Sequence, residues 1–243
     1  MDSIRFKLLQ ARIENDPVRD RERNSFAAGL GVSPKCIETV DMLMGVDNYD
    51  SITDGADAVL VGGSGDFSVT YDLPWLPNFF TTLKDLAHNG FPTFASCFGF
   101  QGMIIALGGK VETDSENLEV GSLMVEKLPE TEKDPLFGEL PSSFICQQGH
   151  VDRATILPDC VDLLAKSQKC PFQAIKVKEA PVYATQFHPE LVGDENRRRF
   201  LQYFDHYIKT IGIEESENIL SSFKESKESS YLLQRFNNLV LSL

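Results

Sequence analysis

The run Phe94-Ala95-Ser96-Cys97-Phe98-Gly99-Phe100-Gln101 joins a short apolar stretch to a helical pattern through a cysteine. Residues 91–96 predict a buried strand, and residues 98–107, closed by two glycines, predict a helix. The N-terminus of a helix stabilises a thiolate, and Gly99 leaves out a side chain where such a turn is tightest. A cysteine in this position is more often a buried apolar residue, but the following Gly99 and Gln101 favour a nucleophile.

Strand and helix patterns alternate on both sides of this run. Further strands are expected at residues 4–9, 36–43 and 56–61. One helix is expected to start at Asp16-Pro17, with Asp16 as its cap, and to stop at Gly29 or Gly31, and another covers residues 79–87. This alternation predicts an α/β fold of three layers, with a mostly parallel central sheet and helices on both faces.

The second half of the chain has a different texture. Short β-like pieces at residues 121–128 and 143–147 flank an acidic loop, which favours antiparallel strands added to the sheet over another βαβ unit. Two more strands are expected at 174–177 and 182–187. Residues 196–211 carry an amphipathic pattern that predicts one helix.

The C-terminal segment is expected to stand apart, so that residues 1–211 form the main domain and residues 212–243 a helical appendage. A stretch rich in Glu, Ser and Lys is followed by apolar residues at helical spacing over 232–243, with Ser229 or Ser230 as the cap. The apolar face of this helix either folds back onto the chain's own core or serves a partner or a second copy.

Composition limits the function. The chain has 243 residues and a formal net charge of −13, which argues against nucleic-acid and anionic-membrane partners because both need a basic surface. The one basic triplet, residues 197–199, is interpreted as a solvated helix face. No apolar segment approaches the ~18 residues of a membrane span. Five scattered cysteines without a C-x-x-C pair predict neither a disulfide framework nor a zinc site, and indicate a reduced, cytoplasmic protein. We expect no cofactor and no metal.

A second run, Gln186-Phe187-His188-Pro189-Glu190, supplies an imidazole and a carboxylate. Together with Cys97, they provide a nucleophile, a base and an orienting group, the requirements of covalent acyl transfer. His150 and Asp152, in the run Gln147-Gln148-Gly149-His150-Val151-Asp152, form the competing imidazole–carboxylate pair.

A glycine pair follows the strand predicted at residues 56–61. The run Gly62-Gly63-Ser64-Gly65 can turn a backbone N–H into the space above the sheet edge, where ligands bind in open α/β folds. With the N–H of Phe98, such a group could hold an oxyanion. No G-x-G-x-x-G or G-K-[ST] pattern follows, which disfavours a phosphate loop.

These motifs and their order resemble the class I glutamine amidotransferase family over residues 4–211, and in particular the glutaminase domain of GMP synthase. The resemblance implies a flavodoxin-like fold and a catalytic triad of Cys97, His188 and Glu190. Gly63 and Phe98 would form the oxyanion hole through their N–H groups. The substrate-binding residues would be Gly62, Gln101, Gln148, His150, Val151 and Asp152. The sequence departs from the family at Ala95, where a glycine is frequent, and at Gln148-Gly149, where Trp or Ser is frequent before the histidine.

The resemblance leaves three functional hypotheses. The first is a glutaminase that cleaves the γ-carboxamide of glutamine through a Cys97 thioester and gives ammonia to an unidentified acceptor. The second is a γ-glutamyl peptidase that acts on peptides or conjugates, and the third is a non-catalytic regulatory module. Expected partners are the small-molecule substrate, a synthetase or other ammonia-accepting protein, and a second copy of the chain.

Overall fold

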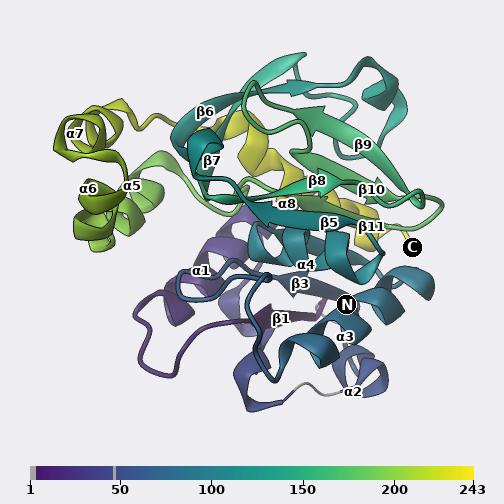
Figure 1. Cartoon of the computed structure of the whole chain (residues 1–243). Coiled ribbons are helices and arrows are strands. Elements are labelled where there is room, and N and C mark those ends of the chain that lie inside the picture. Colours follow the sequence, from purple (N-terminus) through teal and green to yellow (C-terminus); the bar gives the residue numbers. More distant parts are fainter. Residues whose placement is uncertain (1–3, 46–47) are drawn as a thin grey trace.

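The computed structural model describes residues 4–45 and 48–243, and of His206 the backbone only. Within these residues a nine-stranded sheet has the order β2-β1-β3-β4-β11-β10-β9-β6-β7. The first five strands in this order are parallel: β2 (Ile37–Asp41), β1 (Phe6–Gln10), β3 (Ala58–Val61), β4 (Thr93–Ser96) and β11 (Val182–Thr185). The others pair antiparallel: β10 (Ala174–Val177), β9 (Val161–Lys166), β6 (Glu119–Lys127) and β7 (Ser143–His150). The predicted α/β class and the appended antiparallel strands are confirmed (Figure 1).

The centre of the sheet is buried on both faces, since the side chains of β3 alternate between two cores. On one face, helices α3 (Leu76–His88) and α4 (Phe98–Ala106) pack with Val59 and Val61 of β3. On the other, helices α1 (Val18–Leu30) and α8 (Lys227–Val240) pack with Ala58 and Leu60 of the same strand. The three layers follow from β3 being apolar at every position, as a strand covered on both sides must be.

Helix α8 folds back onto the body of the chain. Leu232, Leu233 and Phe236 are fully buried, and the Phe236 ring meets that of Phe94 in β4 edge-on at 5.5 Å. Of the two interpretations of the apolar face, packing on the chain's own core is the one observed. The predicted cap is wrong: the helix begins after Ser226, and the hydroxyls of Ser229 and Ser230 both donate to the Ser226 carbonyl from within the first turn.

Residues 196–211 form two helices rather than the single predicted one. Helix α5 (Gly193–Gln202) ends at Tyr203, and α6 (Phe204–Ile211) follows it, before α7 (Ile213–Ser222). These three helices project from one side of the molecule (Figure 1). The break matters for the site, because it turns residues of both α5 and α6 toward one cavity.

Several other elements differ from those predicted, mostly where the segments are short and polar. The strand predicted at 36–43 is limited to β2, between short 3₁₀ turns at Pro34–Cys36 and Met42–Met44, and two more such turns lie at Ser115–Asn117 and Pro129–Lys133. The sequence did not indicate α2 (Tyr49–Thr53), strand β9, or the two-stranded sheet of β5 (Lys110–Thr113) and β8 (Asp152–Ile156). Strand β5 has one buried residue in four, so it lacks an apolar pattern.

The first helix starts and stops close to the predicted points. Asp16 Oδ1 accepts a hydrogen bond from the Val18 N–H at 2.7 Å, which supports the start of α1. The helix ends at Gly31, whose positive φ of 72° suits glycine, while Gly29 lies inside it against Leu233. Among the described residues, helices long and apolar enough to cross a membrane are absent.

Candidate active site

Cys97 lies on a sharp turn between β4 and α4, at the carboxyl edge of the parallel strands. Its φ of 51° is rare for a residue with a side chain, and such a backbone costs about 1–3 kcal/mol that the surrounding structure must offset. The Cys97 N–H donates to the Thr185 carbonyl at 2.8 Å, and the Gly99 N–H donates to the Gly62 carbonyl at 3.2 Å. A Cβ at Gly99 would lie 2.8 Å from Val61. The turn therefore depends on glycine at position 99, as the sequence predicted.

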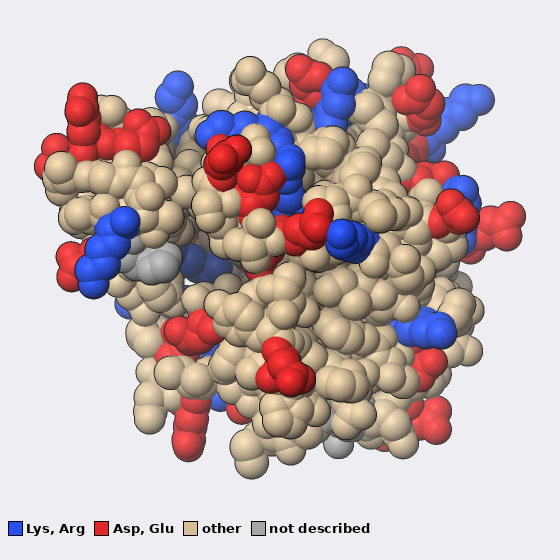
Figure 2. All heavy atoms as spheres, viewed as in Figure 1, with Lys and Arg blue, Asp and Glu red and all other residues tan. Residues whose placement is uncertain are grey.

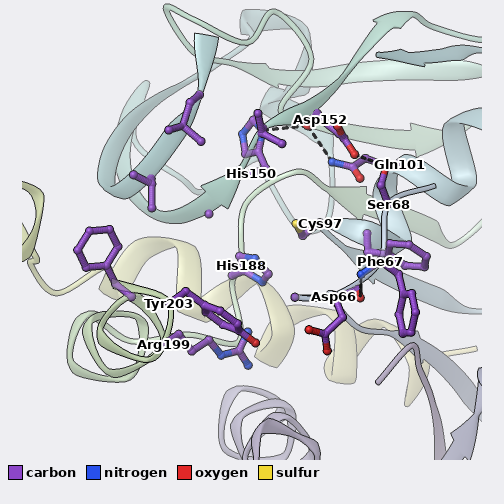
Figure 3. A pocket seen from close by; sticks show the side chains of 18 of the residues that line it. Asp66, Phe67, Ser68, Cys97, Gln101, His150, Asp152, His188, Arg199 and Tyr203 are labelled. Atoms are coloured by element: carbon purple, nitrogen blue, oxygen red, sulfur yellow. Dashed lines mark hydrogen bonds between the residues drawn. The ribbon is translucent and has the colours of Figure 1, made fainter. Parts of the chain in front are cut away.

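His188 and Glu190 lie on the loop that follows β11, the strand next to β4. His188 Nδ1 contacts Glu190 Oε1 at 2.7 Å, and the Glu190 side chain is fully buried. The His188 N–H donates to the Gln147 carbonyl at 2.9 Å, which fixes the loop. Figure 3 shows the imidazole beside Cys97. The structure thus brings together the three residues that the sequence assigned to the triad.

The charges of this pair are strongly coupled. Burial lowers the pKa of His188, but the Glu190 carboxylate and the Cys97 sulfur outweigh burial and raise that pKa to about 10. Burial opposes ionisation of Glu190, yet the His188 imidazolium holds the pKa of this carboxyl below its usual value. The site therefore favours an imidazolium next to the Cys97 sulfur. Because Nδ1 faces Glu190, the ring's Nε2 is left to exchange protons with the reacting groups.

Gln101, His150 and Asp152 form one side of the cavity, which we call the glutamyl end (Figure 3). The Gln101 amide donates to the Asp152 carbonyl at 2.8 Å, and His150 Nδ1 contacts the same carbonyl at 3.0 Å. The Asp152 carboxylate accepts hydrogen bonds from Ser68 and from Thr113. Ser68 and Thr113 were missed because neither has a motif around it. The glutamyl end is thus a hydrogen-bonded network that is already in place.

His150 is held away from the role of catalytic base. Its Nε2 contacts Glu119 Oε2 at 3.2 Å, so both ring nitrogens face oxygen atoms. Glu119, His150 and Cys170 lie close enough together to hold a metal ion, with ligand atoms within 4.8 Å of one another. The Glu119 oxygens already accept hydrogen bonds from Ser167 and Gln173. This cluster is therefore satisfied as a structural network.

Gln186 connects the nucleophile to the glutamyl end. Its side-chain amide donates to Cys97 Sγ at 3.8 Å, and its oxygen accepts from the Gln101 amide at 3.3 Å. The residue stands in the quoted His188 motif, but the sequence assigned it no role. The Gln186 side chain therefore links the Cys97 sulfur to Gln101 through its two polar atoms.

The glycine loop, residues 62–65, lies close to the triad, but the N–H of Gly63 donates its hydrogen bond to a residue outside the triad. A Cβ at Gly63 would lie 2.9 Å from His188 Cε1, so the loop packs against the imidazole. The Gly63 N–H donates to Glu22 Oε1 at 3.2 Å, and Glu22 is fully buried. An oxyanion role for Gly63 therefore requires this peptide to turn, and it stays a prediction, as does the role of Phe98 at the start of α4.

Two residues predicted to bind substrate are not among those that line the cavity. Gly62 is turned toward Glu22, which leaves no room for a Cβ. Gln148 is fully buried, and its amide donates to Gln173 Oε1 at 2.9 Å. Gln101, Val151 and Asp152 do line the cavity, together with His150. Gln148 thus lies behind the wall, with its side chain directed to Gln173 and away from the cavity.

The cavity extends beyond Cys97 and His188, and its volume of about 720 Å³ is within the ~300–1,000 Å³ typical of ligand sites. We call the far side the amine end; it is lined by Arg199, Phe200, Tyr203 and Tyr207 of α5, α6 and the break between them. Figure 2 shows this face hollowed between the projecting helices and the body. The solvated-face interpretation of the basic triplet is wrong for Arg199, whose side chain reaches the cavity.

The chain is similar to a known protein family. The model of the glutamine amidotransferase class-I family matches residues 37–207. The chain is 31% identical over 147 residues to the glutamine-hydrolysing GMP synthase of Thermosipho melanesiensis, an alignment that covers 60% of this chain and 26% of that protein. It is 37% identical over 117 residues to one of the subunits of the glutamine-hydrolysing GMP synthase of Methanococcus maripaludis, covering 47% of this chain and 59% of that one. The chain thus spans less than two thirds of either relative.

Solved structures share the fold. A glutamine amidotransferase from Thermotoga maritima superposes with a TM-score of 0.77 at 19% identity, over 99% of both chains. A glutamine amidotransferase from Methylobacillus flagellatus gives a TM-score of 0.71 at 16% identity, over 98% of this chain and 94% of that one. At these identities the likeness concerns the architecture alone.

Proposed function

Because the chain belongs to the class-I glutamine amidotransferase family, we propose that it hydrolyses the γ-carboxamide of glutamine through a thioester on Cys97 and releases ammonia. The observation that carries the proposal is the triad itself: a thiol on a strained turn, an imidazole beside it, and a buried carboxylate 2.7 Å behind the imidazole. These are the parts that nucleophilic acyl transfer requires.

In the first half of the reaction, the Cys97 thiolate attacks the γ-carbonyl carbon of glutamine and a C–S bond forms. The His188 imidazolium gives its Nε2 proton to the amide nitrogen, the C–N bond breaks, and ammonia leaves. Glu190 holds the ring through Nδ1 and stabilises its positive charge. In the second half, His188 takes a proton from water, which attacks the thioester, and glutamate leaves as the thiol is restored.

The α-amino and α-carboxyl groups of glutamine bind at the glutamyl end. The Asp152 carboxylate lies there within a hydrogen-bonded network and is the natural partner for the α-ammonium group. Gln101 and His150 keep this wall in place through the Asp152 carbonyl. The γ-carboxamide then points toward Cys97, with the Phe98 N–H at the start of α4 available to the developing oxyanion.

We infer that the ammonia is received by a separate synthetase protein. The relative from Methanococcus maripaludis is named as one subunit of a glutamine-hydrolysing synthase, which supports a division of labour between chains. The free state of all five cysteines supports the cytoplasmic location predicted from the sequence.

Replacing the nucleophile tests the function. Cys97→Ala should lower the release of glutamate from glutamine by about 10⁴-fold or more, because the covalent route is removed. Cys36→Ala, on a surface turn away from the site, is the matched control and should retain full activity. Glutamate release by Cys97→Ala at the wild-type rate would rule out the thioester mechanism.

A further inference from the structure

The two ends of the cavity differ in the partners of their charged groups. At the glutamyl end the Asp152 carboxylate is hydrogen-bonded by Ser68 and Thr113. At the amine end, Nε and Nη2 of Arg199 are buried, and neither has a hydrogen-bond partner among the described residues. Buried polar groups are normally paired, and a guanidinium left in this way costs free energy. Such a group is expected to meet an anion when the cavity is filled.

Arg12 lines the same cavity, and its guanidinium, unlike that of Arg199, has hydrogen-bond partners. Its Nε and Nη2 bind both oxygens of Glu22, at 3.0 and 2.7 Å, and its Nη1 binds Asp16 at 2.9 Å. Arg12 therefore has no need of a ligand. Burial and the nearby positive charge of Arg12 lower the pKa of Arg199, and the negative charges of Glu22, Glu190 and Glu195 offset this only in part.

The carboxylates near Arg199 do not pair with it. Glu195, one turn earlier on α5, is engaged at Oε2 with Arg198, and Glu190 is engaged at Oε1 with His188. The second oxygen of each carboxylate, Glu195 Oε1 and Glu190 Oε2, is buried and has no hydrogen bond to Arg199 or to any other described residue. Asp66 lies on the opposite wall of the cavity and is exposed (Figure 3). Among the described residues, none of the three forms an ion pair with Arg199.

The position of His188 tells which part of a substrate reaches Arg199. Figure 3 shows His150, Asp152 and Gln101 on one side of Cys97, and His188, Tyr203 and Arg199 on the other. His188 is the acid that protonates the departing nitrogen, so the leaving group is on its side of the sulfur. The amine end therefore receives whatever the γ-glutamyl group is attached to. Ammonia is too small to use this space.

The walls of the amine end suit an organic leaving group. The Phe200 and Tyr207 rings are stacked, with centroids 4.5 Å apart and planes at 21°. Tyr203 lies over the glycine loop, where its hydroxyl oxygen would collide with a Cβ at Gly65. An apolar side chain can pack on such rings while a carboxylate meets the guanidinium.

We propose, as an extension of the γ-glutamyl chemistry above, that the site also cleaves γ-glutamyl amides of α-amino acids, with Arg199 binding the carboxylate of the leaving amino acid. Cys97 attacks the γ-carbonyl carbon, a C–S bond forms, and the C–N bond to the amino acid breaks. His188 protonates that nitrogen, the amino acid leaves, and water hydrolyses the thioester to glutamate. No oxidant, metal or further reactant enters this balance.

A matched pair of substrates isolates the carboxylate: γ-glutamyl-phenylalanine, and γ-glutamyl-phenethylamine, which lacks only that group. For the wild-type enzyme, kcat/KM should be at least about tenfold higher for the first, the usual size of a charge-assisted hydrogen-bond contribution. Arg199→Met should bring the ratio to about one, and Arg199→Lys should restore part of it. Arg198→Met, on the exposed neighbour in α5, should leave the ratio at its wild-type value.

Two results would overturn the proposal. One is a wild-type ratio near one. The other is an Arg199→Met variant that lowers kcat for both substrates by the same factor, because this would make Arg199 a support for Glu190 only. Binding separates this proposal from the function itself. In a Cys97→Ala background, calorimetry should give tighter binding of γ-glutamyl-phenylalanine than of γ-glutamyl-phenethylamine, and Arg199→Met should remove the difference, whatever the turnover with glutamine.

Discussion

The glutamyl end and the amine end of the cavity are built from different elements of the fold and differ in how their polar groups are paired. The glutamyl end rests on the sheet and on β8, and its polar groups are tied to one another through Asp152. The amine end rests on α5, α6 and the break between them, and its main cation is without a partner among the described residues. A network that is complete before substrate arrives recognises a constant group with little reorganisation. An unsatisfied cation on separate helices instead distinguishes one leaving group from another.

The triad lies between the two ends, and replacing its histidine should have the largest effect on activity. His188→Ala should lower glutamine hydrolysis by about 10²–10⁴-fold, because it removes the acid and base of both half-reactions. His150→Ala should instead change KM, since His150 lies in the wall of the glutamyl end. Labelling of Cys97 by a small alkylating agent separates the two variants. Loss of labelling in His150→Ala but not in His188→Ala would make His150 the base.

Asp152→Asn tests whether the glutamyl end is shared by all substrates. Losing the carboxylate charge that faces the α-ammonium group should raise KM by about tenfold or more, by the same factor for glutamine and for γ-glutamyl-phenylalanine. Steady-state kinetics with both substrates measures this, and the exposed Asp159→Asn is the control. A rise confined to one substrate would mean that the two ends do not act separately.

The smallest expected effect is on the free energy of unfolding, which should depend on pH through the charge of His188. The folded pKa of His188 is raised to about 10, above the ordinary value of about 6.5. The folded protein thus keeps a proton that the unfolded chain releases, so this stabilisation is complete below about pH 6.5 and is lost as the pH rises to about 10. Urea unfolding across this range should show the decline. His188→Asn should flatten this part of the profile, and an unchanged slope would contradict the coupling with Glu190.

The candidate catalytic residues could be selected from the sequence because their positions depend on local pattern. A single strand–helix turn places Cys97 and Gly99, and the loop after the neighbouring strand places His188 and Glu190. Parallel strands bring their carboxyl ends to one edge, so identifying those strands already placed both motifs together. The central strands β3, β4 and β11 were predicted well because every residue in them is buried.

The supporting residues could not be predicted, because they are brought together by long-range packing. Glu22 captures the Gly63 N–H from a helix 41 positions earlier, and Ser68 reaches Asp152 across 84 positions. Nothing around either residue marks it in the sequence. Gln148 was assigned to the pocket through its neighbours, but the strand turns its side chain to Gln173 instead.

Local sequence was enough to predict the fold class and to select Cys97, His188 and Glu190, which the structure brings together. The turn, the strand ends and the residue types involved lie within a few positions of one another in each motif. The extent of the cavity and the direction of each charged side chain were decided only by the tertiary structure. Arg199 illustrates the reason. In the sequence it is one of three arginines on a helix. Packing of α5 and α6 against the body, and the engagement of Arg12 by Glu22, leave its guanidinium at the amine end without a partner among the described residues.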